Sequence, residues 1–264
     1  MRIAADLREA VITLAREAGG HILRIYDSDF AVQSKQDRSP LTEADMASHR
    51  CIVAGLRSLT PEWPVLSEES APQDIEARRT WSLYWLVDPL DGTREFVKRN
   101  GEFTVNIALI AGAIPVFGVV YAPVLDQLFW GGAGFGAGLR QSGGDDVVLL
   151  TRRPAPRSLR IAVSRSHLDP ASAALIAKLH TPLQKPLGSS LKFCQLAQGQ
   201  VDLYPRFGPT GEWDTAAGQA VLEGAGGAVL DLQGHRLRYN ARDTLINPDF
   251  IALGDLDLPW REWL

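Results

Sequence analysis

A pair of aspartates directly after an apolar run constrains this chain more than any other feature. Residues 85–93 read Trp-Leu-Val-Asp-Pro-Leu-Asp-Gly-Thr, which predicts the end of a buried strand followed by a turn. Asp88 and Asp91 are then expected at a buried strand end, where unpaired carboxylates are costly unless a cation compensates them. A short helix is expected from Thr93, and free N–H groups at a helix start suit a phosphate.

Metal ligands beside an anion cradle point to phosphoryl chemistry. The alternative is an ordinary surface turn, because Asp, Gly and Pro are common turn residues. Haloacid-dehalogenase-type phosphatases carry Asp-x-Asp-Gly-Thr, with the nucleophile two residues before the second Asp. Here the two aspartates are separated by Pro and Leu, so that mechanism is disfavoured.

The first half of the chain predicts two helices followed by several strands. Apolar residues at spacings of three and four predict a helix over 6–26, and a second helix is expected from Thr42, as its N-cap, toward Leu59. Further strands are expected at 65–66 and 81–87, and consecutive, mostly antiparallel strands at 102–111, 114–122 and 127–130. A glycine-rich turn is expected over 131–138 and one last strand at 147–150.

A shift to Gly, Asp, Arg and Pro between 143 and 156 predicts a boundary, with an α+β half over 1–150 and an α/β half over 151–264. In the second half we expect strands at 159–163, 201–204, 228–232 and 250–253, and helices from Asp169-Pro170, over 190–198 and over 215–223.

Composition limits the possible partners. The net charge of −4 over 264 residues gives no sign of a surface for nucleic acid or another polyanion. Residues 105–125 carry no charge and are long enough to span a bilayer, but their Gly, Pro and β-branched residues favour two buried strands. The N-terminus lacks the apolar core of a secretory signal. Cys51 and Cys194 are expected as buried free thiols in a reducing compartment.

Four other acidic residues are candidates for the same site, and each has a plainer explanation. Asp45 lies three residues after the expected cap Thr42, where an acid suits the helix dipole. Glu68 and Glu69 follow a strand, so either could be solvated or reach the metal. Asp214 directly precedes a late helix, where it could be only an N-cap.

Several separated motifs together resemble the lithium-sensitive, magnesium-dependent phosphatase superfamily that includes inositol monophosphatase. The resemblance is closer still to its bacterial CysQ-type 3′(2′),5′-bisphosphate nucleotidases, and it spans about residues 1–260. The motifs that carry it lie at 39–45, 67–70, 88–93, 99–106, 164–167, 188–193, 203–208 and 213–218.

The resemblance implies a layered α-β-α-β-α sandwich of the sugar-phosphatase type and a set of residue roles. Two or three Mg²⁺ ions would be held by Glu68, Asp88, the Leu90 carbonyl oxygen, Asp91 and Asp214. Asp45 and Thr93 would orient and deprotonate the attacking water. The substrate would be contacted by Glu68, Leu90, Asp91, Gly92, Thr93, Ser164, His167, Gly188, Lys192 and Asp214.

The nucleotide contacts are the part that the residues alone support least. His167 is a lone histidine, a type that is more often structural. Lys192 could instead be a solvated helix lysine, although the preceding Gly188-Ser189-Ser190 predicts free N–H groups for an anion. Arg206 is either a further phosphate contact or an exposed arginine.

The resemblance implies hydrolysis of the 3′-phosphate of adenosine 3′,5′-bisphosphate to AMP, and possible action on its sulfated form. The alternatives are an inositol or other sugar monophosphatase and a catalytically silent regulatory or Ca²⁺-binding module. The expected location is the cytoplasm, either free or peripheral on the inner membrane. The oligomeric state, monomer or homodimer, stays open.

Overall fold

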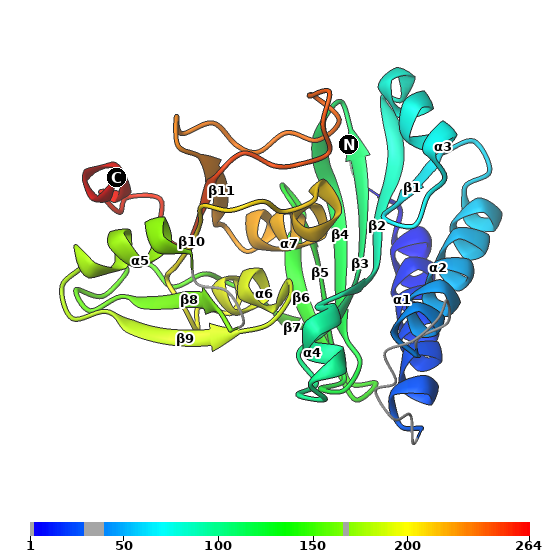
Figure 1. Cartoon of the computed structure of the whole chain (residues 1–264), viewed down its shortest axis with the longest axis horizontal. Coiled ribbons are helices and arrows are strands. Elements are labelled where there is room, and N and C mark those ends of the chain that lie inside the picture. The colour runs from blue at the N-terminus through cyan, green and yellow to red at the C-terminus, as the bar shows by residue number, and fades with distance from the viewer. Residues whose placement is uncertain (1–2, 29–39, 166–168) are drawn as a thin grey trace.

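Two β-sheets alternate with helical layers in this protein (Figure 1). The computed structural model describes residues 3–28, 40–165 and 169–264. The helices are α1 Ala5–Tyr26, α2 Pro40–Leu59, α3 Pro72–Ala77, α4 Thr93–Val97, α5 Pro170–Ala177, α6 Leu191–Ala197 and α7 Glu212–Gly224, with short 3₁₀ turns η1 Arg78–Thr80 and η2 Trp260–Trp263.

The first sheet has seven strands in chain order, β1 to β7. The strands β1 and β2 are parallel and the other neighbours are antiparallel, which confirms the antiparallel arrangement predicted for β3, β4 and β5. The bounds are β1 Val65–Ser67, β2 Leu83–Asp91, β3 Thr104–Ala111, β4 Ile114–Ala122, β5 Gln127–Gly132, β6 Gly136–Gln141 and β7 Val147–Val148. The uncharged run 105–125 thus forms β3 and β4, and none of the helices in the described residues is long and apolar enough to cross a membrane.

The second sheet has five strands in the order β11-β12-β10-β8-β9. Its bounds are β8 Arg160–Ser164, β9 Leu183–Leu187, β10 Leu203–Arg206, β11 Ala228–Asp231 and β12 Phe250–Leu253. The strand β9 was not predicted, because this edge strand is largely exposed and contains Pro186. The helix expected from Asp169 is confirmed, since its side chain accepts the Ser172 N–H at 2.7 Å.

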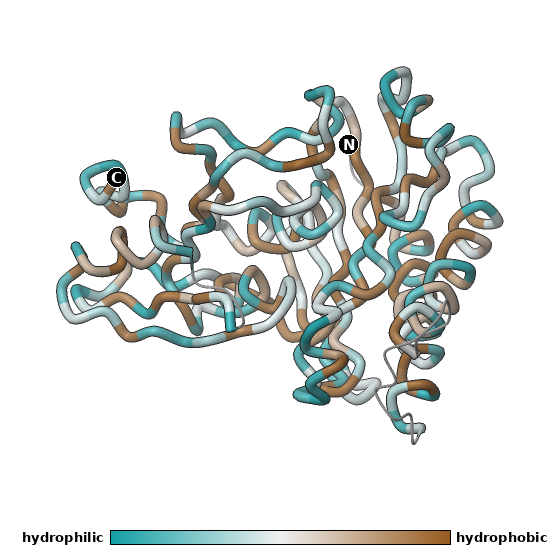
Figure 2. The backbone as a smooth tube through the Cα atoms, viewed as in Figure 1, coloured by the Kyte–Doolittle hydropathy of each residue, from teal (hydrophilic) through white to brown (hydrophobic). Residues whose placement is uncertain are grey.

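Three apolar cores separate the layers, and strand alternation assigns residues to them. On β2, Trp85 and Val87 face α1 and α2, whereas Tyr84 and Leu86 face α6 and α7. A third core lies between the second sheet and α5. The layered α-β-α-β-α fold is therefore confirmed (Figure 1), and bands of apolar and polar residues alternate along α1 and α2 (Figure 2). The division at residue 150 stays a prediction.

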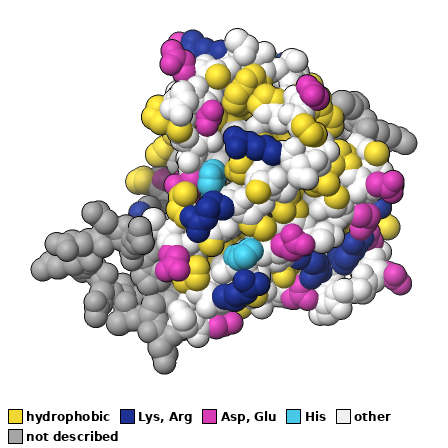
Figure 3. All heavy atoms as spheres, turned by 90° about the vertical axis from the view of Figure 1, so that its right-hand side faces the viewer, with side chains coloured by type: hydrophobic (Ala, Val, Ile, Leu, Met, Phe, Trp, Pro, Cys, Tyr) yellow, Lys and Arg dark blue, Asp and Glu magenta, His cyan; other side chains and the backbone are white. Residues whose placement is uncertain are grey.

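The outer helical layer faces away from the second sheet. Figure 3 views the molecule from the side of α1 and α2, where acidic, basic and apolar side chains are interspersed over the coloured surface. Of the two cysteines, Cys194 is buried and Cys51 is half-buried, and both are free thiols, as expected.

One predicted detail is wrong and another is too wide. The helix α2 begins at Pro40, not at Thr42, because proline suits the first helical turn. Thr42 is therefore not the cap. The glycine-rich turn predicted over 131–138 is present but covers only residues 133–135, since its two ends belong to β5 and β6. A β-carbon at Gly131 would lie 2.9 Å from the Val221 Cα, so this glycine allows α7 to pack closely on the sheet.

Close packing of α7 on β4 predicts that Gly118→Ala will destabilise the protein. A β-carbon at Gly118 would lie 2.8 Å from the Ala217 Cα and 2.9 Å from the Ala220 Cβ. We expect a loss of about 1–3 kcal/mol, typical of an overpacked core, measured by urea unfolding. The control is Gly20→Ala on α1, where nothing lies within 4 Å, and it should stabilise by about 0.5–1 kcal/mol. Equal effects of the two substitutions would contradict the packing argument.

Candidate active site

The end of β2 that carries the aspartates is irregular, and a hydrogen bond from α2 holds it in place. The strand continues to Asp91 rather than ending at Val87 as predicted, and its pairing with β3 is interrupted between Asp88 and Asp91. The Ser48 hydroxyl on α2 donates to the Pro89 carbonyl at 2.8 Å, and the Asp88 Oδ1 accepts the Leu90 N–H at 3.0 Å. The chain turns only at Gly92, whose φ of 92° is accessible mainly to glycine. The predicted helix then starts at Thr93.

Three aspartates from both halves of the chain meet at this point. Asp88, Asp91 and Asp214 each offer a carboxylate oxygen, and these oxygens lie within 4.8 Å of one another. Asp214 is not an N-cap, because α7 begins at Glu212; its Oδ2 instead accepts the Gly211 N–H at 2.8 Å. Hard cations such as Mg²⁺ prefer such all-oxygen donor sets.

Two further acids adjoin this cluster. Glu68 follows β1, and its N–H donates to the Val87 carbonyl at 3.0 Å. Burial and then the charge of Asp91 raise the pKa of Glu68 to about 7. For Asp45, burial, Glu69 and Glu68 raise the pKa to about 8. The structure thus places Glu68 near the aspartates and Glu69 near Asp45.

Asp45 is not explained by helix capping. It lies in the second turn of α2, beyond the capping positions. Its Oδ1 is buried and has no hydrogen-bond partner among the described residues. A buried carboxylate oxygen without a partner is costly, and this orphan atom fits a site that takes up water or a cation.

Burial raises the pKa of every member of the aspartate cluster. The pKa of Asp88 is raised well above its usual value by burial and then by Asp91. The same causes raise the pKa of Asp214 to about 7. For Asp91, burial outweighs Lys192 and the hydrogen bonds that favour its charge. Such crowded acids need protons or a cation, so the residues present fit a divalent metal ion.

Two side chains that the sequence analysis assigned no role hold Asp91. The Ser190 hydroxyl lies 2.8 Å from the Asp91 Oδ2, and Asn106 on β3 donates to that hydroxyl at 2.9 Å. Both residues lie within motifs that carry the resemblance, but only their position on facing segments reveals this contact.

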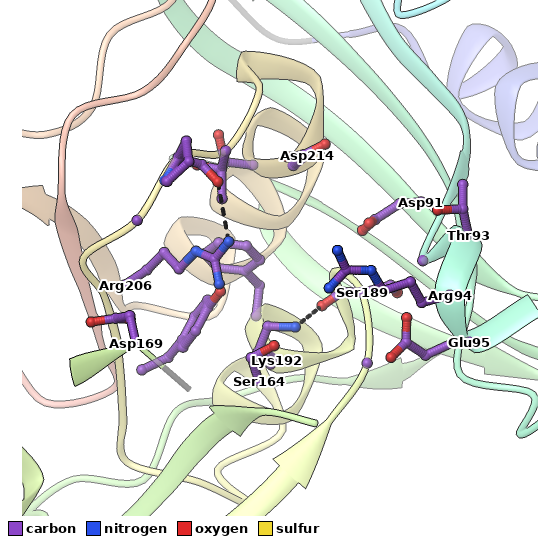
Figure 4. A pocket seen from close by; sticks show the side chains of 18 residues that line it. Asp91, Thr93, Arg94, Glu95, Ser164, Asp169, Ser189, Lys192, Arg206 and Asp214 are labelled. Atoms are coloured by element: carbon purple, nitrogen blue, oxygen red, sulfur yellow. Dashed lines mark hydrogen bonds between the residues drawn. The ribbon is translucent and has the colours of Figure 1, made fainter. Parts of the chain in front are cut away.

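A cleft of about 810 Å³ runs from the aspartates to the second sheet (Figure 4). Gly92 and Thr93 lie at the aspartate side, and Ser164, Gly188 and Lys192 also line the cleft. Thr93 and Asp45 come from different helices, and their pairing stays a prediction. His167 lies outside the described residues. Lining residues that the sequence analysis did not single out are Arg94, Glu95, Asp169, Phe193, Tyr204, Gly208, Pro209, Thr210 and Thr215.

Lys192 is buried rather than a solvated helix lysine. It is 7% exposed, its Nζ donates to the Ser189 carbonyl at 2.5 Å, and it lies 5.4 Å from the centre of the Tyr204 ring. Burial, opposed by the charge of Asp91, lowers its pKa to about 8. Arg206 is half-buried in the cleft wall, donates to the Pro209 carbonyl at 3.1 Å and has a buried Nε without a partner in the described chain.

Free N–H groups were predicted before α6, but those of Gly188 and Ser190 are bound. The Gly188 N–H donates to the Glu102 Oε2 at 2.7 Å, and the Ser190 backbone hydrogen-bonds to Asp91. This segment therefore binds protein carboxylates, and its contribution to an anion site rests on Lys192.

Comparison with known proteins extends this picture. The model of the inositol monophosphatase family matches residues 4–256. The Escherichia coli K12 protein named 3′(2′),5′-bisphosphate nucleotidase CysQ is 49% identical over 244 residues, which cover 92% of this chain and 97% of that protein. The CysQ of Aggregatibacter actinomycetemcomitans is 38% identical over 98% of this chain and 96% of its own length.

Solved structures agree with these sequence relatives. The crystal structure of CysQ from Bacteroides thetaiotaomicron, described as a bacterial member of the inositol monophosphatase family, has a TM-score of 0.84 at 42% identity and covers 93% of this chain and 96% of its own. An inositol monophosphatase from Zymomonas mobilis has a TM-score of 0.80 at 25% identity, with 99% of both chains covered.

The raised carboxyl pKa values predict a pH-dependent stability of the metal-free protein. The unfolded carboxyls titrate near pH 4, whereas Glu68, Asp214 and Asp45 titrate at about 7 to 8 when folded. The folded state therefore binds more protons between about pH 4 and 8, and stability falls as pH rises through this window. We expect the melting temperature in EDTA to fall from pH 5 to 9.

Mg²⁺ should oppose this loss, because it replaces the protons. At about 100 times its Kd it should raise the melting temperature by about 5–10 °C at pH 8. The control is Asp91→Asn, for which both the pH dependence and the Mg²⁺ shift should be smaller. A stability that is independent of pH and Mg²⁺ in the unsubstituted protein would contradict the metal site.

Proposed function

The chain belongs to the inositol monophosphatase family, and we propose that it is a Mg²⁺-dependent 3′(2′),5′-bisphosphate nucleotidase. It hydrolyses the 3′-phosphate of adenosine 3′,5′-bisphosphate to give AMP and phosphate, and the sulfated form of that nucleotide is a second substrate. The observation that carries this proposal is one cleft that joins an acidic cluster to a buried lysine and a half-buried arginine. Such a cleft suits a ligand with two separated anionic groups.

The acidic residues would supply the metal site. Glu68, Asp88, the Leu90 carbonyl oxygen, Asp91 and Asp214 are the proposed ligands of two or three Mg²⁺ ions. When bound, such ions lower the pKa of water and stabilise the charge of the attacking and leaving oxygens.

The remaining residues orient the reactants. Asp45 with Thr93 accepts the proton of the attacking water. Bound metal ions would lower the raised pKa of Asp45, so that its carboxylate would be available. The N–H groups of Gly92 and Thr93 receive the phosphate that is hydrolysed, at the turn where the chain enters α4. Water attacks phosphorus directly, so no phosphoenzyme forms.

The part of the substrate that is not hydrolysed binds at the far side of the cleft. Ser164, Gly188 and Lys192 line this side, and His167 is proposed with them on the sequence resemblance alone. Arg206 is a further phosphate contact, supported by its half-buried place in the wall. A reducing cytoplasmic location is supported by the two free cysteines.

The function is tested by steady-state kinetics with Mg²⁺ on adenosine 3′,5′-bisphosphate, inositol 1-phosphate and fructose 1,6-bisphosphate. We expect the highest kcat/KM for the nucleotide. A higher kcat/KM for inositol 1-phosphate would support the alternative sugar monophosphatase, which the same acidic cluster would serve. No turnover of any of the three would contradict the proposed activity.

Asp45→Ala is expected to lower kcat by about 10²–10⁴-fold with a modest change in KM, as for loss of a general base. Its melting temperature should not fall by the amount that a lost cap would cause, because Asp45 caps nothing. The control is Glu43→Ala, an exposed acid on the same helix, which should keep the original kcat. A normal kcat in Asp45→Ala would remove Asp45 from the mechanism.

Lys192→Met is expected to lower kcat/KM for the bisphosphate nucleotide by about 10- to 150-fold, through loss of a charge-assisted hydrogen bond. Methionine keeps most of the buried volume. Hydrolysis of inositol 1-phosphate, which lacks the second anionic group, should change little. The control is Lys185→Met, an exposed lysine on β9. Similar losses on both substrates would place Lys192 in the shared phosphate site.

A further inference from the structure

One face of β3 and the residue that leads into it hold the segment that carries Lys192. The side chains of Glu102, Thr104 and Asn106 alternate along the chain and therefore lie on one face. They contact successive residues of the facing segment. The Glu102 Oε2 accepts the Gly188 N–H at 2.7 Å, the Thr104 and Ser189 hydroxyls lie 3.0 Å apart, and Asn106 donates to the Ser190 hydroxyl at 2.9 Å.

Glu102 is the charged residue among these three side chains, and it also binds a second segment. Its carboxylate also accepts from Arg165, with the Nε 2.7 Å from Oε2 and the Nη2 2.6 Å from Oε1. Arg165 follows β8 directly and donates as well to the Pro186 carbonyl of β9 at 2.9 Å. The side chain of Glu102 is 19% exposed and that of Arg165 is 39% exposed. One carboxylate from the first half thus holds two segments of the second half.

Gly188 and Gly92 are both packed too closely against their neighbours to accept a β-carbon without strain. A β-carbon at Gly188 would lie 2.5 Å from the Glu102 carbonyl oxygen and 2.8 Å from the Glu102 Cβ. A β-carbon at Gly92 would lie 3.0 Å from the Ser189 Cβ and 3.2 Å from the Glu102 carbonyl oxygen. The turn at Gly92 and the segment before α6 are therefore in direct contact beside Glu102.

These contacts fix the position of Lys192 relative to the aspartates. Lys192 donates to the Ser189 carbonyl, and Ser190 contacts Asp91, so both lie on the segment that Glu102 anchors. The Asn106 side chain also donates to the Asp91 Oδ2. The Glu102 carboxylate, by contrast, contacts Gly188 and Arg165, at the end of the segment away from Asp91.

We propose that Glu102 is a positioning residue that sets the spacing between the phosphate position at Gly92 and the second anchor at Lys192. It thereby favours substrates with two separated anionic groups over simple phosphomonoesters. This inference rests on the proposed function, because only a bisphosphorylated substrate uses both positions. The Arg165 pair supplies the rigidity, since charge-assisted bidentate bonds fix both geometry and orientation.

The experiment compares Glu102→Gln, Arg165→Met and the unsubstituted protein on adenosine 3′,5′-bisphosphate and on inositol 1-phosphate. Glu102→Gln keeps the size but removes the charge that Arg165 and the Gly188 N–H share. We expect KM for the bisphosphate to rise about 10-fold with kcat little changed, as for a displaced binding group. Activity on inositol 1-phosphate should stay within about twofold. Arg165→Met should have the same direction but a smaller effect, because the Gly188 contact remains.

The control is Glu9→Gln, which removes a carboxylate that pairs with Arg140 at 2.7 Å on the outer layer. It should change neither substrate. The Mg²⁺-induced shift in melting temperature should be the same in all variants, because none of these residues is a proposed ligand.

The possible outcomes distinguish a failure of this inference from a failure of the proposed function. If the unsubstituted protein does not hydrolyse the bisphosphate, the proposed function fails and this inference fails with it. If it does, an unchanged ratio of the two substrates in Glu102→Gln, or an equal loss on both, overturns the inference alone. Should Glu102→Gln not fold, Arg165→Met decides by the same ratio, because that side chain is more exposed.

Discussion

The repulsion among buried carboxylates at the end of β2 is the constraint on which the rest of this structure depends. Asp88 is 1% exposed and lies among Asp91, Asp214 and Glu68. Among the described residues, no cation neutralises this group fully, since Lys192 favours the charge of Asp91 but burial outweighs it. The surrounding fold must therefore hold these acids together at a cost that protons or a divalent ion offset.

Two acids at the start of α7 differ in their hydrogen-bond partners. Glu212 is fully buried, yet it accepts the Asn240 N–H at 2.7 Å and an Arg242 Nη2 at 2.9 Å. Asp214, two residues later, accepts the Gly211 N–H from its own turn and has no salt bridge to a cation within the described residues. The pairing of Glu212 anchors the start of α7, and the Asn240 side chain in turn donates to the Arg78 carbonyl. The helix carrying Asp214 is thus anchored, while Asp214 keeps its binding capacity.

The sequence predicted the layers and the acidic residues better than the contacts between the halves. Alternation along β2 and β3 and the period of α1 are local patterns, so they could be recognised without the fold. The cap assigned to Thr42 failed because Pro40 begins the helix earlier, and β9 was missed because an exposed edge strand has little apolar pattern. The carboxylates that bind the Gly188 N–H and the Ser190 backbone, those of Glu102 and Asp91, lie 86 and 99 residues away. No periodicity records such pairings, and so the N–H groups before α6 were wrongly expected to be free.

The buried lysine explains how an acidic protein can hold an anionic substrate. With a net charge of −4, attraction must come from local groups rather than from the overall field. Lys192 has lost most of its hydration, and Asp91 is the charge that most favours its protonated form. In the proposed function, divalent ions that neutralise the aspartates would weaken that support, and an anionic group of the substrate would become a partner for the ammonium. Because such coupling between two ligands is reciprocal, the proposed metal site and the proposed second anchor would act as one binding surface, and the spacing between them would determine which substrates can use both.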